Sequence, residues 1–326
     1  CNFKIKELSG RDAMLNQTEV SEFLLLGLTN IQGLQHFFFT SFLLLYSATL
    51  LGNSIIVIVV ISEPRLHTPM YFFLGNLSCL DMFLSTVTVP KMLTGFLFGH
   101  QPISFGGCLA QLHFFHFLGS TEAVLLAGMA YDRYVAICNP LHYALVMSPR
   151  TCLLLAVASW STGFVHAVVH SVMTSQLSFC GHNQIQHFFC DIKPLLNLAC
   201  SRTRLNMTLL NVVTTSIVLG PFTLVVPSYL HIISFLFYKV QSQEGRWKLF
   251  STCASHLTVV VLFYIPVLLN YTPPSSGNST QMDVQVTLIY SAVTPALNPL
   301  IYTLRNQEVK TALKKTLRRK VFPGGK

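Results

Sequence analysis

The chain has 326 residues, of which 52% are apolar and only 10% carry a charge, and its formal net charge is +9 at pH 7. So few charged residues exclude an ordinary soluble protein of this size and indicate a membrane protein. The excess of Lys and Arg is explained by membrane topology and by attraction to anionic lipid, rather than by nucleic-acid binding.

The first 33 residues are expected to form an extracellular tail. Met14 opens the segment MLNQTEVSEFLLLGL, and residues 1–13 read as an upstream extension or a translated leader that is too polar for a cleaved signal peptide. Asn16 begins an Asn-Gln-Thr triplet, which is a glycosylation acceptor. Asn278, in the loop before the last span, begins a second such triplet.

Long uncharged runs then follow one another along the chain, and a seventh span at 66–98 is interrupted by Asp81. The helical part of each run can reach the roughly 20 residues that cross a bilayer. The predicted fold is an all-α membrane protein, a seven-transmembrane helix bundle over residues 34–304. The other six runs are 23–62, 92–121, 151–190, 205–238, 249–282 and 284–304.

Basic residues set the orientation and describe the tail. Of the 21 Lys and Arg residues, 14 fall in the predicted inner loops and the C-terminal tail, which predicts a cytoplasmic C-terminus and an outside N-terminus. In the cytoplasmic tail, residues 305–326, the apolar Val309, Leu313 and Leu317 recur at helical spacing among lysines and arginines. This pattern predicts a short amphipathic helix on the inner leaflet.

Short motifs recur in order along these spans. The ten residues 129–138 read MAYDRYVAIC and place an Asp-Arg pair at the inner end of the third helix. Together the motifs resemble the olfactory receptor family of rhodopsin-like G-protein-coupled receptors over residues 14–320, although Leu249 stands where that family usually has alanine. The other motifs are Gly52-Asn53, PMYFFL at 69–74, PKML at 90–93, Ser228-Tyr229, KLFSTC at 248–253 and NPLIY at 298–302.

The resemblance implies an odorant receptor and not an enzyme. It implies that a small, mostly hydrophobic, neutral odorant activates a heterotrimeric G protein of the stimulatory, olfactory type and raises cyclic AMP. It also implies a multi-pass protein of the plasma membrane, in the cilia of olfactory sensory neurons, with no cofactor. The residues expected to couple and switch are Asp132, Arg133, Tyr134, Tyr229, Lys248, Asn298, Pro299 and Tyr302.

Four of the nine cysteines fall on the predicted outer side, where thiols oxidise. The resemblance implies disulfides Cys108–Cys190 and Cys180–Cys200, whereas the residues alone leave three pairings open. A metal site is the alternative, since Cys180, His182, His187 and Cys190 have ligand-like spacing.

Asp81 and Glu122 are acids deep within the spans and are expected to face the bundle interior. With Asn53, Ser85 and Asn298 they form either a cluster that holds a cation or proton, or a hydrogen-bonded network with Glu122 protonated by burial. Pro299 breaks the backbone ladder of the seventh helix, and Asn298 is expected to satisfy the freed backbone groups.

The ligand pocket is expected between the outer halves of helices three, five, six and seven, as a mostly apolar cavity with few hydrogen-bonding groups. His116 is the most interesting polar candidate, because it can donate to a carbonyl or hydroxyl group. His166 and His170, one turn apart on the fourth helix, are interpreted as a packing pair. The full set of candidates is Leu112, Phe115, His116, Gly119, Ser120, Val213, Thr214, Ile217, Tyr264, Val267, Leu268, Tyr271, Leu288 and Ser291.

Two other functions are compatible with a chain of this kind. The alternative is a G-protein-coupled receptor for a non-odorant small molecule outside the nose. A transporter is a distant one, because the two halves show no repeat and few charges lie within the spans.

Overall fold

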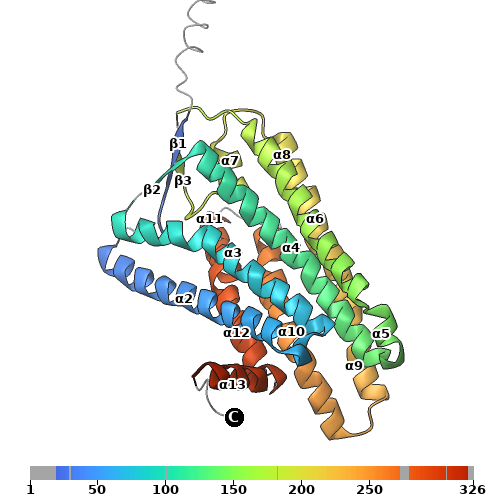
Figure 1. Cartoon of the computed structure of the whole chain (residues 1–326). Coiled ribbons are helices and arrows are strands. Elements are labelled where there is room, and N and C mark those ends of the chain that lie inside the picture. Colours follow the sequence, from blue (N-terminus) through green and yellow to red (C-terminus); the bar gives the residue numbers. More distant parts are fainter. Residues whose placement is uncertain are drawn as a thin grey trace, which may run out of the picture.

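In the described part of the chain, seven helical segments form a bundle, as the sequence predicts (Figure 1). The structure, a computed structural model, describes residues 20–28, 31–99, 101–181, 183–271, 279–305 and 307–321. In chain order the segments are α2 (Gln32–Ser62), α3 (Pro69–Phe98), α4 (Phe105–Cys138), α6 (Pro149–Ser175), α8 (Arg204–Leu209) continuing through the π turn η3 (Leu210–Thr214) into α9 (Thr215–Tyr238), α10 (Gln243–Tyr271), and α11 (Ser279–Leu288) continuing through the π turn η4 (Ile289–Val293) into α12 (Thr294–Arg305).

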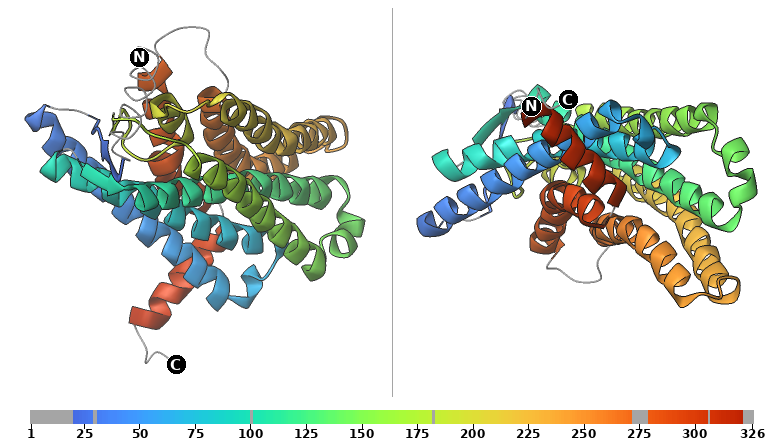
Figure 2. Two further views of the ribbon diagram at one scale, coloured as in Figure 1. Left: turned by 90° about the horizontal axis from the view of Figure 1, so that it is seen from above. Right: turned by 60° about the horizontal axis from the view of Figure 1, so that its bottom comes forward.

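The bundle is built around α4. Six of the helical segments are long and apolar enough to cross a bilayer. The remaining one, α4, is 34 residues long and carries Glu122, Asp132 and Arg133. It packs against α3, α6, α9 and α10, so its polar side chains face protein rather than lipid. The two views in Figure 2 show α4 running through the middle of the bundle.

A small sheet covers the outer end of the bundle beside α7 (Ile192–Leu198). Its strands are β1 (Glu22–Leu25), β2 (Gln101–Ser104) and β3 (Gln184–Ile185), with β1 in the middle, antiparallel to β2 and parallel to β3. Phe23 of β1 is 1% exposed and contacts the rings of Phe105 and Phe179. The segment before the first span is therefore docked on two outer loops, where the sequence predicted only a tail.

Two disulfides tie the long outer loop to the bundle and to itself. They join Cys108 to Cys190 and Cys180 to Cys200, which is the pairing implied by the resemblance. Because both disulfides consume thiols of the proposed metal site, the metal alternative fails, and His182 lies outside the described residues. The glycosylation acceptors Asn16 and Asn278 also lie outside them.

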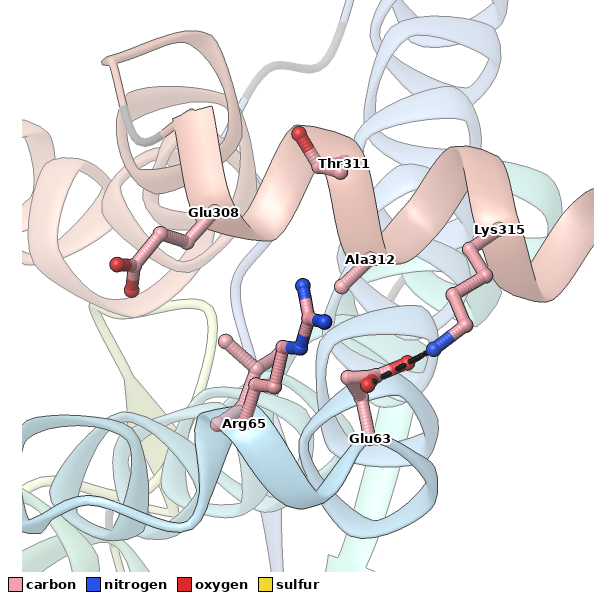
Figure 3. A pocket seen from close by; sticks show the side chains of 7 residues that line it. Glu63, Arg65, Glu308, Thr311, Ala312 and Lys315 are labelled. Atoms are coloured by element: carbon pink, nitrogen blue, oxygen red, sulfur yellow. Dashed lines mark hydrogen bonds and ion pairs between the residues drawn. The ribbon is translucent and has the colours of Figure 1, made fainter.

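At the inner end, α13 (Gln307–Val321) lies across the bundle (Figure 1). Lys315 of α13 forms an ion pair of 2.7 Å with Glu63, and the Tyr71 hydroxyl donates to Glu308 over 2.6 Å. Figure 3 shows the cleft between α13 and the first inner loop, η1 (Pro64–Leu66), with Arg65 pointing towards α13. Val309 is buried, so the apolar face of α13 is covered partly by protein and not by lipid alone.

The second inner loop contains η2 (Pro140–His142) and α5 (Tyr143–Val146). It follows α4 directly and brings Tyr143 back to the end of that helix, where its hydroxyl donates to Asp132 over 2.8 Å.

The Gly52-Asn53 motif lets α2 and α12 meet at Pro299. A Cβ added to Gly52 would lie 2.9 Å from the Pro299 ring. The backbone carbonyl that Pro299 leaves without its helical partner belongs to Pro295, four residues earlier, and it accepts from Asn53 Nδ2 over 3.1 Å. The prediction that Asn298 satisfies this carbonyl was wrong, because its amide donates to Asp81 instead.

A second close approach joins α4 and α6. A Cβ added to Gly163 would lie 2.5 Å from the Phe117 carbonyl oxygen and 2.2 Å from Thr121 Oγ1. Small residues at such crossings let helix backbones pack closely in membranes.

Replacing Gly163 by alanine is therefore expected to push α6 away from α4, at a cost of about 1–3 kcal/mol typical of overpacking. The melting temperature of the purified receptor should fall by several degrees. The matched control is Gly128→Ala on α4, where an added Cβ meets nothing within 4 Å. Equal melting temperatures for the two variants would contradict the close packing.

Candidate functional site

A small cavity lies beneath the disulfide-bonded loop, between α4, α6, η3 and α9, α10 and η4. Its volume is about 30 Å³, which is room for little more than one water molecule. An odorant-sized molecule can enter only if lining side chains move. The lining residues are Phe115, His116, Gly119, Ser120, His166, Thr214, Val218, Phe263, Val267, Tyr271 and Tyr290.

One wall of the cavity is polar and joins three spans. The Ser120 hydroxyl lies 2.7 Å from His166 Nδ1, and His166 Nε2 lies 3.1 Å from the Thr214 hydroxyl. Thr214 also lies 3.4 Å from His170 Nε2, so both histidines of the fourth span take part. They are thus members of a hydrogen-bond chain and more than the packing pair expected from the sequence.

His116 joins this wall to the outer loop. Its Nε2 lies 3.2 Å from an Asp191 carboxylate oxygen, and its ring centroid is 5.7 Å from that of His166. Burial alone would raise the pKa of Asp191, but the hydrogen bond from His116, the nearby histidines and the backbone N–H of Ile192 hold it below its usual value. Asp191 therefore stays ionised and fixes the His116 ring.

The opposite wall is aromatic and belongs to the sixth and seventh spans. The Tyr290 ring of η4 lies 5.8 Å from that of Phe115 and is tilted by 45° to it, and its hydroxyl accepts from Asn270 over 3.2 Å. Lys193 of the outer loop donates to the Asn270 carbonyl, pairs with Asp283 at 3.5 Å and lies 5.5 Å from the Tyr271 ring. The loop is thereby fastened to the outer ends of α10 and α11.

Seven of the fourteen predicted ligand-binding residues line this cavity: Phe115, His116, Gly119, Ser120, Thr214, Val267 and Tyr271. The other seven lie elsewhere. Tyr264 is turned towards α4, where its hydroxyl donates to the Ala123 carbonyl over 2.7 Å, and the Ser291 hydroxyl donates to Thr287 of its own helix. Outside the lining are also Leu112, Val213, Ile217, Leu268 and Leu288.

Four lining residues were missed by the sequence analysis: His166, Val218, Phe263 and Tyr290. Val218 and Tyr290 follow or lie in the π turns η3 and η4, which shift the helical phase on which the prediction relied. His166 was missed because the fourth span was not expected to reach the pocket. The spacing of His166 and His170, with Asp191 directly after a disulfide cysteine, was the available signal.

Below the cavity, the predicted polar core takes the form of a hydrogen-bonded network. Asn298 Nδ2 lies 2.9 and 3.1 Å from the two carboxylate oxygens of Asp81, and the Ser85 hydroxyl approaches the Ser291 carbonyl. One Glu122 oxygen has no hydrogen-bond partner among the described residues. In the part of the chain described, no cluster of three or more His, Cys, Asp or Glu side chains is arranged to hold a metal ion.

At the inner end of α4, the Arg133 side chain is held in an ion pair with Asp132, an arrangement called closed below. Its guanidinium donates to Asp132, which also accepts from Tyr143. The pKa of Tyr143 is raised, first by burial and then by the Asp132 carboxylate, so its hydroxyl stays protonated and donating. Arg133 is thus neutralised by Asp132 of α4, whose carboxylate is held in place by Tyr143 of the second inner loop.

The other predicted coupling residues lie on α4, α9, α10 and α12. The Tyr229 hydroxyl lies 2.6 Å from His256 Nδ1 and joins α9 to α10. The Tyr302 hydroxyl is buried without a hydrogen-bond partner among the described residues, and the Tyr134 ring lies 5.7 Å from that of His231. Pro299 lies inside α12. Lys248 lies in α10, but its side chain is outside the described part.

In the outer loop, His187 packs against the rings of Phe188 and Phe189, and its buried Nδ1 has no hydrogen-bond partner in the described part of the chain. Burial, opposed in part by Asp191, lowers the pKa of His187 to about 4. The unfolded chain, with an ordinary histidine pKa near 6.5, therefore binds the proton first as the pH falls. Folding stability should then drop between pH 6.5 and pH 4.

Replacing His187 by phenylalanine is expected to remove this contribution, which amounts to roughly 2 kcal/mol by pH 5. Melting temperatures of the purified wild type and the variant, measured at pH 7 and pH 5, test it. The wild type should lose more stability than the variant on acidification. Parallel losses in the two proteins would contradict the buried, neutral state of His187.

Comparison with known proteins gives one consistent answer. The family model described as olfactory receptor matches residues 42–320. Human Olfactory receptor 12D1 is 57% identical over 95% of this chain and 97% of its own length, and human Olfactory receptor 12D2 is 56% identical over 94% of this chain and 100% of its own length. Mouse Olfactory receptor 1E16 is 49% identical over 92% of this chain and 95% of its own length. With its seven-helix bundle and closed Asp-Arg pair, the chain belongs to the olfactory receptor family of G-protein-coupled receptors.

Proposed function

We propose that this multi-pass membrane receptor binds a neutral, mostly hydrophobic odorant in the cavity beneath the outer loop and activates a stimulatory, olfactory-type G protein, which raises cyclic AMP. The observation that carries the proposal is the pairing of one outer cavity with one closed Arg133 site on the same helix, α4. The chemistry of the lining supports the ligand class, since Phe263, Val267 and Val218 offer apolar surface and the charged groups beyond the rim are already paired, Asp191 with His116 and Lys193 with Asp283.

The small volume of the cavity suggests how binding produces a signal. A ligand must displace side chains, and among the lining residues outside the polar wall Phe263, Val267 and Tyr271 come from α10. Bound ligand therefore favours a conformation in which α10 has moved away from α4, because only that conformation accommodates it. Pro266 within α10 and Pro299 within α12 provide points at which these helices can bend.

At the inner end, the same movement separates α10 from α9 and α4. The Tyr229–His256 hydrogen bond then breaks, which frees the Tyr229 hydroxyl. We infer that Arg133 leaves Asp132 and that Tyr229 and Tyr302 turn in to line a cleft for the C-terminal helix of the G protein. Asp81 and Asn298, which are hydrogen-bonded to each other, and the buried Glu122 lie between the two ends and would transmit the change.

The proposal includes the cellular setting. We place the N-terminus outside and the C-terminus inside on the distribution of basic residues, and Asn16 and Asn278 as glycosylation acceptors on the outer side. The cilium of an olfactory sensory neuron is the proposed location, on the strength of family membership alone.

Replacing Arg133 by alanine is expected to abolish the odorant response without removing the receptor from the surface. Cyclic AMP would be measured in cells that express the receptor, a trafficking factor and an olfactory-type G protein, across a panel of neutral, acidic and basic odorants. Surface staining at equal levels in wild type and variant is the control. A response of equal size in the variant would refute coupling through Arg133.

Tyr264 gives a second test, because its hydroxyl joins α10 to the Ala123 carbonyl of α4. Tyr264→Phe removes one hydrogen bond, worth about 1 kcal/mol, from the closed state alone. Basal cyclic AMP should therefore rise several-fold relative to surface level. The matched control is Tyr46→Phe, which removes a 3.1 Å tyrosine bond to Thr86 between α2 and α3. Equal basal activity in the two variants would contradict the role of α10.

A further inference from the structure

The polar wall of the cavity forms a single chain of hydrogen bonds that runs from Ser120 on α4 through His166 on α6 to Thr214 at the end of η3. All three residues line the cavity and are at most 8% exposed. The middle member comes from the fourth span and contacts hydroxyl groups on both sides of its ring. The Ser120 hydroxyl is the end of the chain, so the state of His166 decides what Ser120 can offer to a ligand.

A neutral imidazole has one nitrogen that donates and one that accepts, so the chain has two proton arrangements. In the first, Ser120 donates to His166 Nδ1, His166 Nε2 donates to Thr214, and Thr214 donates to His170. Ser120 then presents lone pairs to the cavity. In the second, His166 Nδ1 donates to Ser120, Thr214 donates to His166 Nε2, and His170 Nε2 donates to Thr214, so that the Ser120 proton is free.

We propose that His166 is a positioning residue for ligand specificity, which sets the Ser120 hydroxyl so that the receptor selects neutral molecules with one oxygen function, a hydroxyl or a carbonyl, on an apolar body. The inference rests on the proposed function and names its ligand class. A ligand hydroxyl donates to Ser120 in the first arrangement, and a ligand carbonyl accepts from Ser120 in the second. Both proton arrangements keep every hydrogen bond of the chain.

The rest of the cavity agrees with this class. His116, the other polar candidate, already uses Nε2 on Asp191. Val218, Phe263 and Val267 give the cavity apolar surface besides this hydrogen-bond chain, and that surface can contact the hydrocarbon part of a ligand. A hydrocarbon without an oxygen forms no hydrogen bond with Ser120 and gains apolar contact alone, so it binds less tightly than an oxygenated ligand of the same length.

The test uses methyl ketones, the corresponding secondary alcohols and n-alkanes of six to ten carbons as probes, with cyclic AMP as the readout. In wild type, ketones and alcohols should be at least about tenfold more potent than the alkane of the same length. Ser120→Ala and His166→Phe should each cost the oxygenated probes about tenfold and leave the alkanes within about threefold. Without His166, the Ser120 hydroxyl turns to a carbonyl of its own helix.

Three further variants separate specificity from structure. His113→Phe is the matched control, because His113 makes a comparable 3.0 Å bond to Ser171 between α4 and α6 but lies outside the cavity lining. It should leave the preference for oxygenated probes intact. The double variant Ser120→Ala with His166→Phe should lose no more than either single variant. His166→Asn, whose amide can donate or accept near the Nδ1 position, should retain the preference.

The inference is overturned if wild type does not prefer oxygenated probes or answers none of them, if the variants weaken all probes alike, or if the double variant loses about a hundredfold. Any of these results leaves the proposed function standing as long as some other neutral compound in the panel gives a response that depends on Arg133. If no neutral compound gives such a response, the proposed function itself fails.

Discussion

The bilayer interior offers no hydrogen-bond partners, so the polar groups of α4 are stabilised by partners within the bundle. This constraint organises the whole receptor. Near its outer end, α4 carries Cys108, which holds the long loop, and further in His116, which bonds to Asp191 of that loop. Arg133 at its inner end is closed by Asp132 and, through it, Tyr143. One helix thus joins the proposed ligand site to the proposed coupling site.

The walls around α4 differ in how firmly they are held. On one side, Gly163 lets α6 approach closely, and Ser120, His166 and Thr214 join α4, α6 and η3 through short hydrogen bonds. On the other, the hydrogen bond between the described residues of α10 and α4 is that of the Tyr264 hydroxyl, while Lys193 bonds α10 to the outer loop and His256 bonds it to α9. We propose that a ligand that needs more room than the cavity provides displaces α10 from α4, and that this displacement reaches Arg133.

Much of this arrangement follows from the sequence, because its strongest signals are local. Length and apolarity predict the spans, and the Asp132-Arg133 pair at the end of a helix predicts the closed coupling site. The features that the sequence does not predict depend on helical phase and on contacts between distant segments. The π turns η3 and η4 rotate the fifth and seventh spans, so Val218 and Tyr290 face the cavity while Ile217 and Leu288 do not.

The remaining differences have the same origin. Pro299 frees the Pro295 carbonyl, which accepts a hydrogen bond from Asn53 and not from Asn298, the residue before Pro299. Asn298 donates to Asp81 instead, because that carboxylate lies within reach. Nothing in the sequence around Phe23 distinguishes it from an exposed apolar residue of a tail, because the residues that bury it belong to the outer loops. His166 belongs to a span that spacing alone does not direct towards the cavity. Each of these depends on which helices become neighbours, and that information is spread over the chain.

The most direct test of the account is the distance between the second inner loop, which directly follows α4, and the inner end of α10. Spin labels at Leu145 and Trp247, which are 78% and 72% exposed, would report it in a receptor whose cysteines outside the two disulfides are replaced. The account predicts that an activating odorant, together with the G protein, lengthens this distance by several ångströms, and that the Arg133→Ala variant raises no cyclic AMP. An unchanged distance in a receptor that still raises cyclic AMP would contradict it.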